Sequence, residues 1–183
     1  MAFGETFLDW SVTLMYGQSQ SRGPNNVAWT IPQYDRQTFN SAGKLLIVDE
    51  GSITLGERNF ALDVINNWRS SHSFPLHCLK MNLIQKSRSV DEKAIIAQRL
   101  KRLPSIDAKL RQHNAWMNLT QMQDIGGCRV IVRSVNSVEK IVQKYKVAIA
   151  KNPKRGHQFH KENDYISLPK DDGYRSYHLV YKY

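Results

Sequence analysis

The stretch Asp124-Ile125-Gly126-Gly127-Cys128-Arg129-Val130-Ile131-Val132 decides the fold of this chain. Cys128 and the residues from Val130 to Val132 are apolar or β-branched, as a buried strand requires. The two glycines before the strand allow a sharp turn or the close approach of another group. Asp124 has no Lys or Arg as its immediate neighbour, so at the mouth of a strand it is a candidate ligand for Mg²⁺. The alternative is an ordinary turn in which Asp124 caps a loop amide.

The composition is that of a basic globular protein. The chain has 183 residues, of which 41% are hydrophobic and 23% are charged, enough for one domain with a core and an appended segment. A formal net charge of +10 favours phosphate-rich partners such as nucleotides or RNA. Cys78 and Cys128 have neither zinc-site nor disulfide-framework spacing, and no signal peptide or membrane-spanning run is present in the sequence. We therefore expect a cytoplasmic protein without a membrane partner.

The first third of the chain predicts a segment of unclear role followed by two helices. Residues 1–50 read as irregular, with a loop over Gln18 to Asn26 and a short strand over Lys44 to Val48. Thr54 and Glu57 match a capping box. The helix that follows should end near residue 71, and a second should run from about residue 79 to 87. The expected buried face of the first helix consists of Phe60, Ala61, Val64, Ile65 and Trp68.

A basic strand–helix junction comes next. Ala94 to Lys101 predicts a strand, with a helix as the alternative, and Ser105 is the expected N-cap of the following helix. Arg99 and Lys101 would share one face of the strand, while Ser105 and Lys109 would share one face of the helix. Three cations and a hydroxyl at a helix N-terminus suit a polyphosphate. A solvated basic face is the alternative.

The last third predicts a helix and two strands. Apolar residues at helical spacing indicate a helix of roughly Ser137 to Lys151, and the chain closes with strand-like residues 179–183. A Pro-Lys-Asp-Asp-Gly loop lies between two strand-like pieces, and Tyr174 stands at its end beside Arg175. An aromatic ring among cations can stack on a nucleobase while the cations hold its phosphates. An ordinary hairpin with Tyr174 half buried is the alternative. His157 and His160 read as surface or packing residues.

These three stretches together resemble the nucleotide pyrophosphotransferase (synthetase) domain of the RelA/SpoT family, which makes the alarmone (p)ppGpp. The family's Arg-x-Lys…Ser…Lys element resembles residues 99–109, with the same spacing. Its Asp-Ile-Ala-Gly-x-Arg element resembles residues 124–129, with Gly126 in place of alanine. Its Asp-Tyr-Ile…Pro-Lys…Gly-Tyr-Arg-Ser-x-His element resembles residues 164–178. Three matches in the right order are far more specific than one short motif.

The resemblance implies a role for each site residue. Asp124 would be catalytic and hold Mg²⁺, and Arg99 and Arg129 would sandwich the adenine of ATP. Lys101, Ser105 and Lys109 would hold the triphosphate of ATP. Tyr174 would stack on the guanine of the acceptor nucleotide, and Lys170, Arg175 and His178 would help to bind that nucleotide.

The resemblance also implies the fold and the reaction. We expect an α/β (mixed α+β) nucleotidyltransferase-like domain, with a central mixed sheet flanked by helices, over residues 56–183, and an N-terminal segment over residues 1–55. The β,γ-pyrophosphate of ATP would pass to the 3′-hydroxyl of GDP or GTP. The alternatives are a toxin-type relative that modifies the 3′-end of tRNA or an adenine nucleotide, and an inactive basic module that binds nucleotide or RNA. The N-terminal segment could contact an antitoxin or a regulator.

Two departures from the family pattern bear on these expectations. Asn163 stands where many members carry a basic residue, so one phosphate contact would be missing. The family's later Glu-x-Gln-x-Arg-Thr strand, which supplies a second catalytic carboxylate, would lie after Tyr183. We therefore expect this chain to be a fragment of a longer protein, and the fragment itself to be inactive if that carboxylate is essential.

Overall fold

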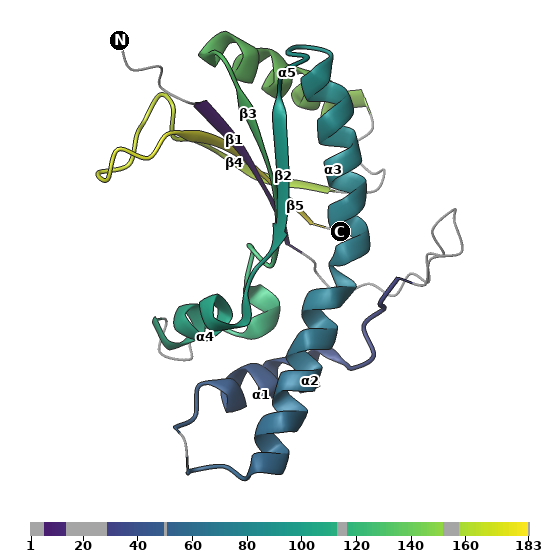
Figure 1. Cartoon of the computed structure of the whole chain (residues 1–183), viewed down its shortest axis with the longest axis vertical. Helices are drawn as coiled ribbons and strands as arrows, with labels where there is room; N and C mark the ends of the chain where they lie inside the picture. The colour runs from purple at the N-terminus through teal and green to yellow at the C-terminus, as the bar shows by residue number, and fades with distance from the viewer. Residues whose placement is uncertain (1–5, 14–28, 50, 113–116, 152–157, 183) are drawn as a thin grey trace. The chain divides into compact units, whose positions relative to one another are not determined.

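The computed structural model describes residues 6–13, 29–49, 51–112, 117–151 and 158–182 (Figure 1). The chain contains both helices and strands, which confirms the mixed α+β class. In chain order the elements are β1 (Thr6–Thr13), α1 (Arg36–Leu46), α2 (Leu55–Ser71), α3 (Ser73–Arg88), β2 (Ile95–Leu100), α4 (Leu103–Gln112), the short 3-10 helix η1 (Leu119–Gln121), β3 (Gly126–Val132), α5 (Val135–Lys151), β4 (Gln158–Asp164) and β5 (Ser176–Lys182).

The chain divides into two compact units. The first, called the sheet unit here, consists of Met1–Val12, Pro75–Arg99 and Gly127–Tyr183. The second, called the helical unit, consists of Thr13–Phe74 and Leu100–Gly126. Each unit is described by itself below.

The sheet has the strand order β2-β3-β1-β5-β4. Strands β4 and β5 pair antiparallel from Gln158 opposite Lys182 to Asp164 opposite Tyr177, with an irregularity between Phe159 and Lys161. The backbone N–H of Lys101 donates to the carbonyl of Ile125 at 2.7 Å. This bond joins the end of β2 to the start of β3, so these two neighbouring strands also run antiparallel.

Burial alternates along β3. Cys128, Val130 and Val132 are buried, whereas Gly127, Arg129 and Ile131 are only partly covered. Because successive side chains of a strand point to opposite faces, one face of β3 belongs to the core and the other stays accessible. Helices α3 and α5 contribute the apolar partners of the core, which include Leu76, Leu79, Leu83, Val138, Ile141 and Tyr145.

Cys128 lies at the contact between the sheet and α3. Its Sγ lies 3.6 Å from the carbonyl oxygen of Leu76, and its side chain is buried. Burial raises the pKa of the Cys128 thiol to about 12, only partly opposed by the charge of Lys80. The thiol is therefore protonated at neutral pH and packs as a small apolar group.

An ion pair between the buried Asp91 carboxylate and the largely exposed Arg133 connects the two loops next to α3 and β3. Asp91, after α3, has a side chain that is 1% exposed, and one of its oxygens accepts from Nη2 of Arg133 at 2.8 Å. The same carboxylate also accepts from the backbone N–H groups of Arg133 and Lys93. Hydrogen bonds from Arg133 outweigh burial and hold the pKa of Asp91 below its usual value. The ionised carboxylate thus ties the end of α3 to the end of β3.

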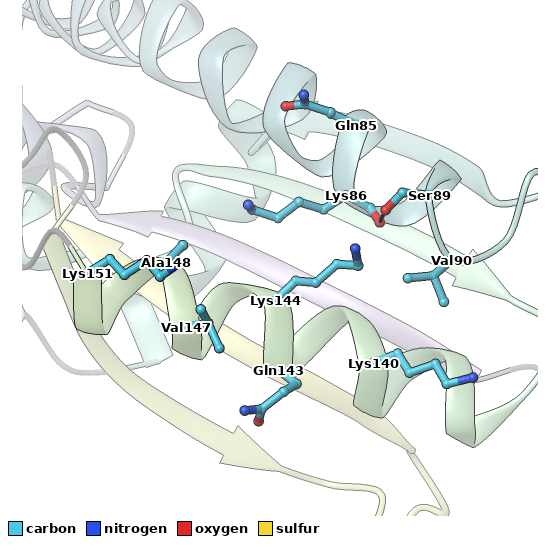
Figure 2. A pocket seen from close by; sticks show the side chains of 10 residues that line it. All are labelled: Gln85, Lys86, Ser89, Val90, Lys140, Gln143, Lys144, Val147, Ala148 and Lys151. Atoms are coloured by element: carbon cyan, nitrogen blue, oxygen red, sulfur yellow. Dashed lines mark hydrogen bonds between the residues drawn. The ribbon is translucent and has the colours of Figure 1, made fainter.

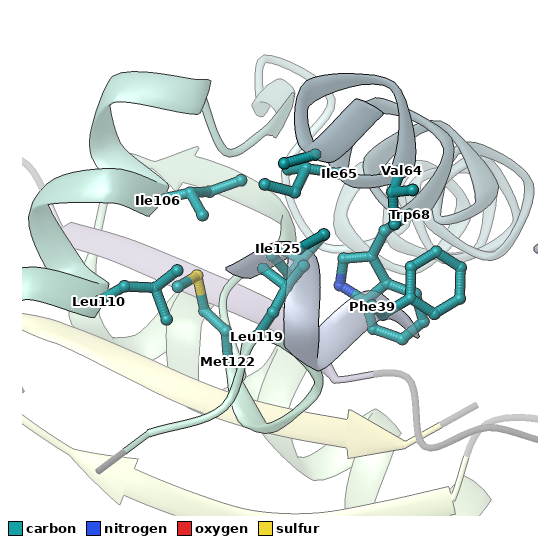
Figure 3. Close-up of a cluster of buried hydrophobic side chains, with 11 residues drawn as sticks. Phe39, Val64, Ile65, Trp68, Ile106, Leu110, Leu119, Met122 and Ile125 are labelled. Atoms are coloured by element: carbon teal, nitrogen blue, oxygen red, sulfur yellow. The ribbon is translucent and has the colours of Figure 1, made fainter. Parts of the chain in front are cut away.

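The helical unit has its own core, shown in Figure 3. Helix α1 packs against α2 and η1, and the rings of Phe39 and Trp68 contact each other at a tilt, with 4.8 Å between their centroids. The expected capping box at Thr54 and Glu57 is confirmed, and α2 ends at Ser71 as expected. Ile106 and Leu110 of α4, together with Leu119, Met122 and Ile125, complete this core.

Three sequence expectations about local structure are wrong. Residues 1–50 are not irregular, because they contain β1 and α1. The residues from Lys44 to Leu46 end α1 instead of forming a strand: the Asp35 side chain caps Thr38 and starts a helix whose apolar face already includes Phe39. Ser105 is not the N-cap, since α4 begins two residues earlier at Leu103.

Other expectations held with small changes. The strand at 94–101, the helix ending near Ser87 and the strand at 179–183 correspond to β2, α3 and β5. Of the predicted buried face of α2, Phe60 is 50% exposed and the other four residues are buried. The predicted loop over Gln18 to Asn26 lies outside the described residues.

Gly43 in α1 provides a test of how tightly the helical core is packed. A Cβ at this position would lie 2.9 Å from Cβ of Leu119, an atom close to the backbone that cannot move away cheaply. We expect Gly43→Ala to lower the free energy of unfolding by about 1–3 kcal/mol, because overpacking exceeds the gain in helix propensity of about 1 kcal/mol. Urea unfolding followed by circular dichroism measures this change.

Gly56→Ala is the matched control, because a Cβ there would meet only Oγ1 of Thr54 at 3.9 Å in the first turn of α2. Its unfolding free energy should stay equal or rise slightly. Equal stabilisation by both substitutions would contradict the close packing of α1 on Leu119.

Candidate functional site

The helical unit brings together three residues that are far apart in sequence, here called the Asp124 cluster: Lys101, Lys109 and Asp124. Nζ of Lys101 donates to Oδ2 of Asp124 at 2.9 Å, and Nζ of Lys109 donates to Oδ1 at 2.6 Å. Lys101 follows β2, Lys109 lies on α4, and Asp124 precedes β3. Two cations predicted to bind phosphate and the carboxylate predicted to bind a metal therefore contact one another directly.

The backbone around Lys101 is held from two sides. Its N–H donates to the carbonyl of Ile125, and its carbonyl accepts from Nε of Arg69 on α2 at 2.9 Å. These bonds fix the point from which the Lys101 side chain leaves the chain. Arg69 had no predicted role, and its contribution shows only in the folded structure, because a long-range bond to a backbone carbonyl leaves no sequence pattern.

The Asp124 cluster is charged and partly exposed. Burial of the Asp124 carboxyl favours its neutral form, but the hydrogen bonds and charges of Lys101 and Lys109 outweigh this effect and lower its pKa below the usual value. The Asp124 side chain is 38% exposed and that of Lys109 is 30% exposed. At neutral pH the carboxyl group of Asp124 is therefore ionised and within reach of solvent.

Ser105 lies on the accessible side of α4. It is exposed in the first turn of this helix, four residues before Lys109, so the two residues share a face. The hydroxyl and ammonium groups are donors of the kind that bind phosphate oxygens. Ser105 is therefore accessible to a phosphate group, as its predicted role in binding the triphosphate requires, although the prediction that it is the N-cap of α4 is wrong.

The sheet unit contains a second group of predicted residues, here called the aromatic cluster: Tyr165, Lys170, Tyr174 and His178. Nζ of Lys170 lies 4.8 Å from the ring centroid of Tyr165 and 5.2 Å from that of Tyr174. The hydroxyl of Tyr174 lies 3.0 Å from Nε2 of His178. The three rings pack edge to face, with Tyr165 and His178 separated by 5.1 Å. One cation and three rings are thus held within a single surface site.

A tight turn positions the aromatic cluster. Gly173 has φ of 80°, its N–H donates to the carbonyl of Lys170, and the N–H of Lys170 donates to the carbonyl of Tyr174. The Asp172 side chain accepts from the N–H of Tyr174 at 2.9 Å. Positive φ requires glycine here, so the turn sets Lys170 and Tyr174 against each other. Arg175, the next residue, is exposed.

Tyr165 is the member of the aromatic cluster that sequence reasoning gave no role. Its N–H donates to the carbonyl of Ser176 at 2.9 Å, where β4 and β5 pair. Lys170 lies over its ring as closely as over that of Tyr174. The Asp-Tyr-Ile motif contains this tyrosine, but motif spacing alone does not show that it contacts a lysine five positions later.

Arg99 and Arg129 lie on the neighbouring strands β2 and β3 of the sheet. Arg99 is exposed, and Arg129 belongs to the partly covered face of β3 rather than to the core face. Both guanidinium groups are therefore outside the apolar core. Their predicted stacking on the two faces of an adenine stays a prediction.

The residues around Asp124 fit a magnesium ion that is shared with a substrate. Mg²⁺ in phosphate-transferring sites is held by one or two carboxylates and by substrate phosphates. Asp124 supplies one ionised carboxylate beside two lysines, for which phosphate binding stays a prediction. Among the described residues, no three His, Cys, Asp or Glu side chains gather in a way that could hold a metal by themselves. No helix within the described ranges is both long enough and apolar enough to cross a membrane.

The comparison with protein families agrees with these observations. A family model described as a region found in RelA / SpoT proteins matches residues 98–183. This segment includes the Asp124 cluster, the aromatic cluster, Arg99 and Arg129, and it supports nucleotide pyrophosphotransferase activity in general without fixing the acceptor. A search of the curated proteins finds no match to the chain.

The electrostatics of the Asp124 cluster can be tested by titration. We expect Lys109→Met to raise the pKa of Asp124, because burial, which favours the neutral carboxyl, would then be opposed by Lys101 alone. Since the folded pKa is depressed in the wild type, the Lys109 contact stabilises the protein above about pH 4, and this contribution is lost as the pH falls through the folded pKa. Carboxyl ¹³C NMR and unfolding at pH 7 and pH 2 measure both effects.

Arg111→Met is the control, because Arg111 lies on the same helix but pairs with Asp107. It should leave the Asp124 titration unchanged. The assigned contacts would be wrong if Lys109→Met lowered the pKa of Asp124 or if both substitutions shifted it equally.

Proposed function

We propose that this chain, whose residues 98–183 carry the RelA/SpoT region, transfers the β,γ-pyrophosphate of ATP to the 3′-hydroxyl of GDP or GTP. The observation that carries the proposal is the Asp124 cluster, in which two lysines contact the same carboxylate. Such an arrangement supplies both a phosphate-binding pair and a metal-binding oxygen from one set of side chains.

The triphosphate of ATP competes with Asp124 for the two lysines. Each ammonium is paired with one oxygen of the same carboxylate, so the single negative charge of Asp124 is shared between two lysines. A triphosphate carries more negative charge than one carboxylate, so Lys101 and Lys109 gain by contacting it, and Ser105 adds a hydroxyl donor on the same face of α4. The oxygens of Asp124 would then be free to hold a metal. A magnesium ion held there would supply positive charge against the negative charge on the transferred group and on the leaving AMP.

The transfer itself needs little covalent work from the protein. A bond forms between the acceptor 3′-oxygen and the β-phosphorus of ATP, the bond from that phosphorus to the bridging oxygen of AMP breaks, and the hydroxyl proton is released. The rate then depends mainly on holding both nucleotides in line and on stabilising charge in the transition state. Lys101 and Lys109 serve the second purpose, and Arg99 and Arg129 would hold the adenine.

The aromatic cluster is the proposed acceptor site. A base can stack on the ring of Tyr174, while Lys170 and Arg175 provide positive charge for the acceptor's phosphates. The Tyr174 hydroxyl contacts His178, which orients a second polar group toward the same site. A compact site of one aromatic platform and two nearby cations suits a nucleoside diphosphate or triphosphate.

The competition between Asp124 and the triphosphate has a measurable consequence. In Asp124→Asn, both lysines lose their charged partner, so we expect ATP without Mg²⁺ to bind about tenfold more tightly than in the wild type, equivalent to about 1.4 kcal/mol. Pyrophosphate transfer should be lost, because the metal-binding carboxylate is gone. Calorimetric titration with ATP in EDTA and AMP release in Mg²⁺, both in the longest available form of the protein, measure the two effects.

Asp107→Asn is the matched control, because Asp107 lies on α4 and pairs with Arg111. It should change neither quantity. Retained turnover in Asp124→Asn would show that Asp124 is a turn residue, and weaker Mg²⁺-free binding would contradict the competition.

The acceptor is identified by supplying ATP labelled at the γ-phosphate with GDP, GTP, ATP and deacylated tRNA in parallel. We expect label on the guanine nucleotides and AMP release. Base–aromatic stacking is worth roughly 1–3 kcal/mol, so Tyr174→Ala should weaken acceptor binding about ten- to a hundredfold without changing ATP affinity. Tyr174→Phe should keep most of the binding, because the stack needs the ring.

Tyr177→Ala serves as the control, because Tyr177 lies three residues later, on β5, and has Lys146 over its ring instead. Label on tRNA alone would contradict the alarmone proposal and support the toxin-type alternative. Binding of nucleotide without any AMP release would support the inactive module.

A further inference from the structure

A groove lies between α3 and α5 in the sheet unit, outside the residues proposed for transfer (Figure 2). Its volume is about 810 Å³, and its polar lining comes mainly from Gln85 and Lys86 of α3 and from Lys140, Gln143, Lys144 and Lys151 of α5. Figure 2 shows Lys86 and Lys144 reaching from opposite helices into the space between them. The groove is therefore lined by four lysines on two adjacent helices.

The positive charge of this groove is not balanced locally. None of the ten residues that line it is acidic. Helix α3 contains no Asp or Glu, and α5 contains only Glu139. Within the described part of the chain, Lys140, Lys144 and Lys151 form no ion pair, whereas Lys146 on the same helix pairs with Glu162 at 3.1 Å.

Lys86 shows the effect of placing several lysines close together, because the charge of Lys144 acts on it. Its Nζ lies 5.0 Å from the ring centroid of Tyr145, so its side chain is held against α5. Burial and the charge of Lys144 both lower the pKa of Lys86. An anion in the groove would relieve this repulsion, and the free energy gained would appear as binding affinity.

The spacing of the lysines favours an extended anion. Lys140, Lys144 and Lys151 follow one another along α5 over eleven residues, which corresponds to about 16 Å of helix. A single RNA strand presents one phosphate per nucleotide along its length and can follow such a row. Among the described residues that line the groove there is no aromatic residue and no arginine, the groups that stack on bases or bind phosphate in a bidentate way. Contacts from lysine alone hold phosphates without reading the bases.

We propose that the groove between α3 and α5 binds the phosphate backbone of a single RNA strand, independently of sequence. This function is separate from pyrophosphate transfer, because the groove shares no residue with the Asp124 cluster or the aromatic cluster. Part of the positive charge of the chain would thereby serve a second site, made of residues other than those proposed to bind ATP and its acceptor.

The test compares two double variants with the same loss of charge. Lys140→Gln with Lys144→Gln removes two groove lysines, and Lys93→Gln with Lys161→Gln removes two exposed lysines outside the groove. The probe is a fluorescein-labelled, mixed-sequence, 20-nucleotide RNA, followed by anisotropy between 50 and 300 mM KCl. Each phosphate contact contributes about fivefold at 0.1 M salt, so the groove variant should bind about 25-fold more weakly, with a salt slope smaller by about 1.4.

The control variant should bind RNA as the wild type does, apart from a small uniform effect of net charge. AMP release and the melting temperature should be unchanged in both double variants. If Lys140→Gln with Lys144→Gln lowers the melting temperature, Lys140→Gln with Lys151→Gln replaces it as the groove variant. Equal weakening in both variants would overturn the proposal, because the attraction would then belong to the whole surface. Loss of GTP binding with retained RNA binding would also overturn it and assign the groove to a compact nucleotide.

Discussion

The alternation of side chains along β3 is the constraint on which the sheet unit depends. A strand can place only every second residue in the core, so burying Cys128, Val130 and Val132 leaves Arg129 on the other face. A shift of one residue would bury the guanidinium and expose the apolar residues, at a cost that no local contact could offset. The core therefore fixes the position of a residue that the core itself does not need. Helices α3 and α5 are divided in the same way: one side of each helix packs in the core, and the lysines on the other side do not disturb the sheet.

Two aspartates show how exposure decides what an ion pair can do. Asp91 is almost fully buried against Arg133 and accepts additional backbone hydrogen bonds, so exchanging its partner would leave a buried charge unpaired. Asp124 contacts two lysines that come from different elements, and more than a third of its side chain is exposed. Its contacts are as short, but solvent and ligands can reach all three groups. The first pair is suited to holding loops in place, and the second is suited to exchange with a more highly charged anion.

Sequence reasoning predicted the helices and strands that follow from local periodicity and capping. It missed the strand and the side-chain contacts that depend on residues far away in the sequence. The capping box at Thr54, the strand after Gly127 and the spacing of Ser105 and Lys109 on one face of α4 are local patterns, and the structure contains each of them. Strand β1 was missed because its partners β3 and β5 lie far along the chain, and strand pairing of that kind leaves little local signal. Motif matching identified Lys101, Lys109 and Asp124, but their mutual contact, and that of Lys170 with Tyr165, required the folded chain.

Because Cys128 is buried between β3 and α3, its reaction with a thiol reagent reports when these two elements separate. Cys78 is only half covered on α3, whereas Cys128 lies under that helix with a thiol that hardly ionises at neutral pH. A thiol-specific reagent can therefore approach the first cysteine in the native state, but it meets the second only when α3 separates from β3. Cys78 would be labelled first, and the slower labelling of Cys128 would measure the rate at which the core between α3 and β3 becomes exposed. Native-state fluctuations of the sheet unit can thus be timed chemically, without introducing a probe into the core.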